Sequence, residues 1–156
     1  MRTQSRTVCE QPTAVVRATL RRDELARWFG GAFDQVADHL RRHGVAPRGF
    51  PFARYHLRPD GRFEVEAGFP VGSRIAGDDQ VRPSRLPGRH VVVAWHVGPY
   101  VELGEAYQAV DEWLKAQHGI RAGDSWEVYH DPPIGNPRYW RTEVIQPYEL
   151  ARVEAR

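Results

Sequence analysis

Two stretches of this sequence, 74 residues apart, carry the same pattern of apolar side chains, and this internal repeat limits the folds open to the chain. Each copy has four apolar residues at helical spacing: Ala32, Phe33, Val36 and Leu40 in the first, Ala106, Tyr107, Val110 and Leu114 in the second. The hairpins that follow also align: Phe52, Tyr55 and His56 with Trp126, Tyr129 and His130, then Phe63, Glu66 and Pro70 with Trp140, Glu143 and Pro147. Two copies are too few for a solenoid, so the repeat predicts two similar modules.

The first copy predicts a strand, a helix and a hairpin. We expect strands over Val8–Glu10 and Ala14–Thr19, with a kink at Pro12. A helical segment over Asp23–Phe29 should break at Gly30-Gly31, because each glycine costs about 1 kcal/mol relative to alanine inside a helix. A longer helix should then begin at Ala32 and end before Gly44, and the hairpin strands are expected at Phe52–Leu57 and Phe63–Phe69.

The second copy follows residues 72–87, which are rich in Gly, Pro, Asp and Arg, show no periodicity and predict a linker. Arg89–Val97 is apolar on both strand faces, as in a central strand. A helix is expected over Leu103–Leu114, and strands over Trp126–His130 and Tyr139–Ile145.

These elements predict one α+β domain over residues 1–156. It should contain two βαββ modules related by a pseudo-twofold axis, with a curved antiparallel sheet and two long helices on one face. We expect module one at about residues 8–71, the linker at 72–87, module two at about 88–148 and a short tail at 149–156.

Composition narrows the classes of function. No stretch approaches the ~18 apolar residues of a membrane span, and no apolar run follows the first arginines as in a signal peptide. Cys9 is the only cysteine, which fits a reducing cytoplasm. The net charge is +2 and the arginines are scattered among acidic residues, so we expect no direct binding to nucleic acid or membrane.

Glu143 is the first candidate for a functional side chain. Strand alternation puts Thr142 and Val144 on one face and Arg141, Glu143 and Ile145 on the other. An isolated strand glutamate is usually solvated, but the repeat supplies an equivalent, Glu66. A groove between the modules would bring both carboxylates to a concave site, where small ligands usually bind.

At this point the chain resembles a known family, the GyrI-like small-molecule-binding domains, which are also the effector-binding domains of AraC-type and MerR-type multidrug-sensing regulators. The resemblance covers about Val8 to Tyr148. It lies in Leu86-Pro87-Gly88, in His96-Val97-Gly98-Pro99-Tyr100, in Glu64 to Pro70 and in Thr142-Glu143-Val144.

The resemblance implies a twinned βαββ fold whose cleft holds hydrophobic, often cationic, aromatic compounds, with a glutamate matching Glu143 among aromatic side chains. Some free-standing members open strained cyclopropane-type rings, and the founding member inhibits DNA gyrase. No helix-turn-helix segment accompanies the domain, so we expect the ligand domain alone, with gyrase or another protein as an alternative partner.

Aromatic residues near the two hairpins and helices are the candidate walls of the ligand site: Trp95, Tyr107, Tyr129, Tyr55 and Phe33. Phe33 and Tyr107 lie on the apolar stripes of the helices, so we expect them in the core. Tyr55 and Tyr129 are better candidates for the site, because they precede the acidic strands and a buried tyrosine hydroxyl normally binds a partner such as a carboxylate. If the cleft is catalytic, Glu143 would act as base and Tyr129 as proton donor. Arg141 shares a face with Glu143 and is an alternative partner for its charge.

No motif predicts a cofactor or a metal site. His39 and His43 have the i, i+4 spacing of metal ligands, but no third ligand of fixed spacing accompanies them. His96 and His130 are candidates for core residues, and no serine or cysteine lies in a nucleophile motif.

Overall fold

A computed structural model describes residues 2–151, which form two compact units. The N-unit is residues 9–88. The C-unit combines residues 2–8 with residues 89–151. Each unit has a layer of antiparallel strands and one long helix, so the predicted α+β class is confirmed.

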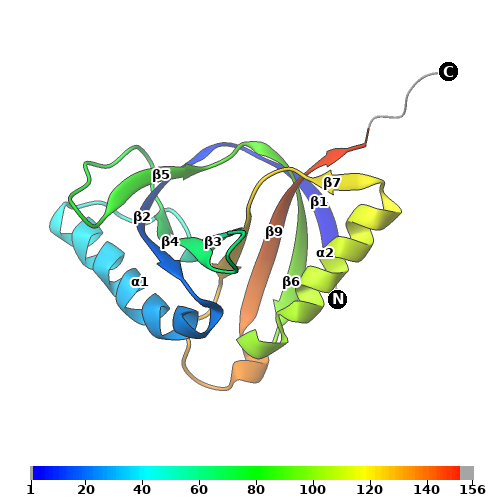
Figure 1. Ribbon diagram of the computed structural model, residues 1–156. Helices are drawn as coiled ribbons and strands as arrows, with labels where there is room; N and C mark the ends of the chain where they lie inside the picture. Colours follow the sequence, from blue (N-terminus) through cyan, green and yellow to red (C-terminus); the bar gives the residue numbers. More distant parts are fainter. Residues whose placement is uncertain (1, 152–156) are drawn as a thin grey trace. The chain divides into compact units, whose positions relative to one another are not determined.

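The N-unit has four antiparallel strands in the order β3, β4, β2, β5. Its elements are β2 (Gln11–Leu20), the short 3-10 helix η1 (Arg22–Glu24), α1 (Leu25–Arg42), β3 (Phe52–Leu57), β4 (Phe63–Pro70) and β5 (Arg82–Leu86). Helix α1 packs on β2 and β4 (Figure 1). The predicted hairpin is confirmed as β3 and β4, and Gly61 adopts the left-handed backbone (φ 84°) that its turn requires.

Helix α1 runs without interruption through Gly30-Gly31, so the predicted break is wrong. Both glycines are exposed, while Trp28, Phe29 and Phe33 pack against the core of the unit. Burying a large apolar side chain is worth about 1.5–3 kcal/mol when complete, which exceeds the cost of about 1 kcal/mol for a helical glycine. Packing of the apolar face therefore overrides the weak local propensity.

Part of the expected linker is also ordered into a strand. Arg82–Leu86 forms β5, which pairs with β2 in the register Ala14↔Pro83 and Thr13↔Ser84. Proline has no N–H to donate, and it is tolerated here because β5 lies at the edge of the N-unit's strands. The predicted linker is therefore wrong for these five residues.

The C-unit has four antiparallel strands in the order β1, β6, β9, β8, and β7 pairs with the far end of β9. Its elements are β1 (Arg2–Val8), β6 (Arg89–Val97), η2 (Tyr100–Glu102), α2 (Gly104–Ala116), β7 (Gly119–Arg121), β8 (Ser125–Tyr129), η3 (Pro137–Tyr139) and β9 (Arg141–Leu150). Helix α2 packs on β6 and β9 (Figure 1). The central strand at Arg89–Val97 is confirmed.

The predicted strand at Val8–Glu10 is wrong for Cys9 and Glu10, because β1 covers Arg2–Val8 and ends where that strand was expected to begin. The residues of β1, RTQSRTV, are polar and lack a clear apolar alternation, yet all seven pair with β6. Tyr139, which was expected to open the last strand, lies instead in η3 and is mostly exposed.

The internal repeat is confirmed in the two cores. Ala32, Val36 and Leu40 are buried in the N-unit core. Their equivalents in the C-unit core are Ala106, Val110 and Leu114. Among residues 2–151, no helix is both long and apolar enough to cross a membrane.

Candidate functional site

A buried carboxylate on β8, Glu127, forms the centre of a polar and aromatic cluster in the C-unit. In the register of β8 and β9, Glu127 pairs with Val144 and Tyr129 pairs with Thr142. Val144 belongs to the core beneath α2, and paired residues share a face of the strands. Glu127 and Tyr129 therefore face the same side as α2.

Two tyrosine hydroxyls donate hydrogen bonds to Glu127. The Tyr129 hydroxyl lies 2.7 Å from Oε1, and the Tyr107 hydroxyl, from α2, donates to Oε2. The glutamate is only 6% exposed. Hydrogen bonds to both carboxylate oxygens stabilise the ionised form and fix the orientation of the group.

The Tyr129 ring beside this carboxylate contacts a second aromatic ring, which in turn contacts a third. The ring centroids of Tyr129 and Tyr100 are 5.6 Å apart, and those of Tyr100 and Trp140 are 4.9 Å apart. These are contact distances for aromatic pairs. We call Glu127, Tyr107, Tyr129, Tyr100 and Trp140 the Glu127 site.

Burial and two carboxylates together affect the phenol of Tyr100. Burial of the phenol raises its pKa above the ordinary value, and the charges of Asp131 and Glu127 raise this pKa further. Two carboxylates thus act on an aromatic ring that has a partly exposed position.

Glu143 lies on the other face of β9, away from α2, as strand alternation predicts, but it is buried rather than solvated. It is 7% exposed, and its Oε1 lies 2.6 Å from Nε2 of His130. Its Oε2 lies 3.1 Å from the Arg6 guanidinium in an ion pair that lacks hydrogen-bond geometry. The Trp95 ring packs on His130 at 4.8 Å between centroids.

The repeated glutamate, Glu66, also has an arginine partner. Its Oε1 lies 2.8 Å from Nε of Arg17, and the Ser84 hydroxyl donates to the same carboxylate. Both repeated glutamates thus form ion pairs with an arginine of their own unit.

Arg141 pairs with Asp131 rather than with Glu143. Its guanidinium makes two hydrogen bonds, Nε to Oδ2 at 3.0 Å and Nη2 to Oδ1 at 3.1 Å. These bonds, and a third from the Arg141 backbone N–H, hold the pKa of Asp131 below its ordinary value. Arg141 therefore does not neutralise Glu143.

The candidate wall residues fall into separate clusters. Tyr107 and Tyr129 meet at Glu127, whereas Trp95 lies beside His130 and Glu143. In the N-unit, Phe33 and Tyr55 both contact the ring of Phe29.

Glu127, Tyr100 and Trp140 were missed as site residues. At the repeat offset of 74 Glu127 corresponds to Ala53, so the match between the two copies gave no signal for a carboxylate at this position. Ala53 is fully buried on β3, so a carboxylate at the equivalent position needs polar partners. The sequence did contain one signal for this site: the two hairpins align, but Glu127 is charged where the first copy has Ala53.

Comparisons with known proteins agree with this fold. Residues 2–149 match the family model of the GyrI-like small molecule binding domain. The C-terminal domain of EcmrR has a TM-score of 0.83 and 17% identity, covering 96% of this chain and 98% of that one. A hydrolase from Listeria innocua has a TM-score of 0.70 and 13% identity, covering 95% and 92%.

A further similar structure is SAV2435 bound to tetraphenylphosphonium, with a TM-score of 0.65 and 12% identity over 96% of this chain and 94% of that one. At identities this low, the structural likenesses show the fold alone. No curated protein sequence matches the chain significantly.

Proposed function

Because this chain belongs to the GyrI-like small-molecule-binding domain family, we propose that it captures hydrophobic, often cationic, aromatic small molecules at the Glu127 site. The observation that carries the proposal is the buried Glu127 carboxylate, held by the hydroxyls of Tyr107 and Tyr129 beside further aromatic rings. The role would be binding or sequestration without chemistry.

The residue types at this site match the chemistry of a lipophilic cation. A carboxylate supplies charge attraction, and each aromatic face contributes about 0.5–2 kcal/mol of cation–π energy as the site loses water. The Tyr100 and Trp140 rings offer flat surfaces against which an aromatic ligand stacks.

Glu143 is the second candidate for the ligand carboxylate. Its charge is already matched by Arg6, and His130 lies within hydrogen-bond distance. A cationic ligand would have to compete with these partners at Glu143. The two glutamates therefore form a matched pair for mutagenesis.

The test is calorimetric titration with tetraphenylphosphonium as the cationic probe and triphenylphosphine oxide as a neutral one. Glu127→Gln should weaken cation binding at least about tenfold, because a desolvated charge partner is typically worth more than about 1.4 kcal/mol. Binding of the neutral probe should change much less.

Glu143→Gln is the matched control, with circular dichroism to show that both variants keep the fold. It should retain cation affinity within about threefold of wild type, since its charge is already paired. If Glu127→Gln binds the cation within twofold of wild type, the proposed site is wrong. A loss in Glu143→Gln alone would assign the ligand to Glu143.

A second candidate function is hydrolytic opening of a strained ring, which the Tyr129 to Glu127 hydrogen bond favours because it joins an acid and a base. Glu127 would take a proton from water while the water oxygen bonds to a ring carbon. The strained C–C bond breaks, its electron pair passes into a conjugated acceptor, and a tyrosine hydroxyl protonates that acceptor. The pair predicted from the sequence, Glu143 and Tyr129, lies on opposite faces of the strands.

Incubation with an aromatic cyclopropane-bearing compound in ¹⁸O-water tests this alternative. Hydrolysis predicts a labelled ring-opened product from the wild type and turnover at least about a hundredfold slower in Glu127→Gln. Unchanged compound after demonstrated binding would leave sequestration as the function. Inhibition of gyrase stays a prediction that rests on the founding member of the family.

A further inference from the structure

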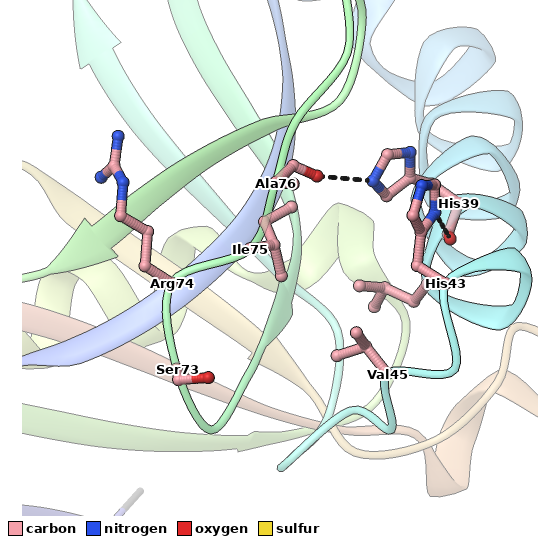
Figure 2. Close-up of a pocket in the computed structure, with 8 residues that line it drawn as sticks. His39, His43, Val45, Ser73, Arg74, Ile75 and Ala76 are labelled. Carbon is pink, nitrogen blue, oxygen red and sulfur yellow. Dashed lines mark hydrogen bonds between the residues drawn. The ribbon is translucent and has the colours of Figure 1, made fainter.

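The N-unit contains a cavity of about 270 Å³ between the C-terminal end of α1 and the chain that follows β4. Eight residues line it: His39, Leu40, His43, Val45, Ser73, Arg74, Ile75 and Ala76 (Figure 2). We call this space the His43 cavity. The Glu127 site lies in the C-unit, so the cavity belongs to a part of the molecule that the proposed function does not use.

The His43 cavity has an apolar wall and an exposed rim. Leu40 is buried, and Val45 and Ile75 are partly buried and pack against the core of the N-unit. In contrast, His43 and Ser73 are exposed. Because residues of the rim are exposed, a small molecule can enter the cavity from solvent and bury apolar surface against its wall.

His43 is a polar group whose orientation in the cavity is fixed. Its backbone N–H donates to the carbonyl oxygen of His39 at 3.2 Å, and its ring Nδ1 lies 2.8 Å from the same oxygen (Figure 2). A carbonyl oxygen only accepts, so Nδ1 carries a hydrogen and Nε2 of the neutral ring has a lone pair. Within the described part of the chain, Nε2 has no hydrogen-bond partner. It is therefore an acceptor that a ligand can use.

His39 supports the His43 ring. The two rings stack with their centroids 4.2 Å apart. His39 is only 1% exposed, and its Nε2 lies 3.1 Å from the carbonyl oxygen of Ala76, on the other wall of the cavity (Figure 2). The acceptor on His43 is thus held in place by a buried neighbour as well as by its own backbone contact.

The charges near the cavity favour a neutral ligand. Arg74 is the charged residue of the lining set, and its side chain extends away from both histidines (Figure 2). The Asp78 carboxylate lies 3.3 Å from Nδ1 of His39, and its other oxygen accepts the N–H groups of Gln80 and Val81. An ionic ligand would lose water without gaining a dedicated counter-charge, which is costly.

The volume of the cavity suits a small aromatic molecule. An apolar cavity of about 150 Å³ is large enough to bind benzene, and pockets for drug-sized ligands begin at about 300 Å³. The His43 cavity lies between these sizes. A complementary ligand therefore has one or two fused rings for the apolar wall and a single N–H or O–H group for the acceptor.

The second copy of the repeat has different residues at the positions of the two histidines. At the offset of 74, His39 corresponds to Trp113 and His43 to Gln117. In the C-unit the Trp113 ring packs on Tyr148, with 5.0 Å between centroids. The histidine pair thus belongs to the first copy alone, just as the Glu127 carboxylate belongs to the second.

We propose that the His43 cavity is a binding site for small neutral aromatic molecules that carry one hydrogen-bond donor, such as indoles and phenols. The rings of the ligand pack against Leu40, Val45 and Ile75, and its N–H or O–H donates to Nε2 of His43. This site is independent of the capture of cations at Glu127 and takes a different class of ligand.

Nuclear magnetic resonance titration of the wild-type protein supplies the direct test, at about pH 8, where imidazole in water is neutral. Indole is the probe, and 1-methylindole is the matched probe without a donor. Indole should shift the ring signals of His39 and His43 and the amides of Ser73 and Ile75 in a saturable way. Its affinity should be at least about threefold higher than that of 1-methylindole, the usual effect of one neutral hydrogen bond.

His43→Phe keeps an aromatic ring but has no acceptor, so it should bind the two probes within about twofold of each other. Gln117→Phe changes the equivalent position of the second copy and should keep the wild-type preference. A wild-type preference in His43→Phe would overturn the proposal. So would the absence of saturable shifts at the cavity residues, or equal affinities of the wild type for both probes, results that do not depend on whether a variant folds.

Discussion

Glu127 and Glu143 show that burial alone does not identify a functional carboxylate. The two are almost equally buried on adjacent strands of the C-unit. Glu143 has a guanidinium and an imidazole as partners, whereas two phenol hydroxyls donate to Glu127. The partners therefore distinguish the two residues.

The Tyr100 phenol has a raised pKa because it is partly buried and because Asp131 and Glu127 lie nearby. Its raised pKa means that the folded protein keeps this phenol neutral at a pH where the unfolded chain, with a pKa of 10.0, has begun to ionise. Stability from the neutral phenol is therefore present below pH 10 and lost as pH rises toward the folded pKa.

Tyr100→Phe should remove one transition from the ultraviolet titration of phenolate, and the missing transition should have its midpoint above pH 10. In Glu127→Gln the Tyr100 midpoint should move down, because one of the two nearby charges is lost. A missing transition at or below pH 10 would contradict the raised pKa of Tyr100, and an unchanged midpoint in Glu127→Gln would contradict the contribution of the Glu127 charge.

At the scale of single elements, α1 shows where local preference gives way to packing. The sequence indicates a break at Gly30-Gly31, and the structure has 18 helical residues there. A Cβ added at either glycine would meet nothing within 4 Å, so neither glycine is required by a close contact.

Gly30→Ala and Gly31→Ala should each raise the free energy of unfolding by about 0.5–1 kcal/mol, measured by urea denaturation. Gly68→Ala is the contrasting control, because its Cβ would lie 1.8 Å from the carbonyl oxygen of Ala14, and it should destabilise the protein strongly. If Gly30→Ala instead lowered the free energy of unfolding, the expectation that glycine costs stability at this position of α1 would be wrong.

Strands with a strong apolar pattern were predictable, and strands at the edges were not. Arg89–Val97 is apolar on both faces and its bounds agree with β6. In contrast, β1 and β5 carry arginines and few apolar residues, and they form strands because each pairs with a partner far away in the sequence. Backbone pairing with a distant strand does not require an alternation of apolar residues in the edge strand, so the sequence of β1 or β5 alone does not indicate it.

For the whole chain, the repeat predicted the two helices, the hairpins and the core positions of both units, because burial restricts both copies in the same way. It could not predict the Glu127 site, since that site depends on a position where the copies differ, Ala53 against Glu127. Positions that match between the two copies therefore indicate the core of each unit, whereas a position at which they differ, such as Glu127, indicates a candidate site.

The pairing of β1 with β6 also sets an order of events during synthesis. Arg2–Val8 is synthesised before its partner Arg89–Val97, and the whole N-unit lies between the two strands in the sequence. At about 5–20 residues per second, β1 waits on the order of 10 seconds with its backbone unpaired. Its polar, arginine-containing sequence suits that interval, since charged edges resist association with other nascent chains. The C-unit, and with it the Glu127 site, can therefore complete its strand pairing only after the N-unit has been synthesised.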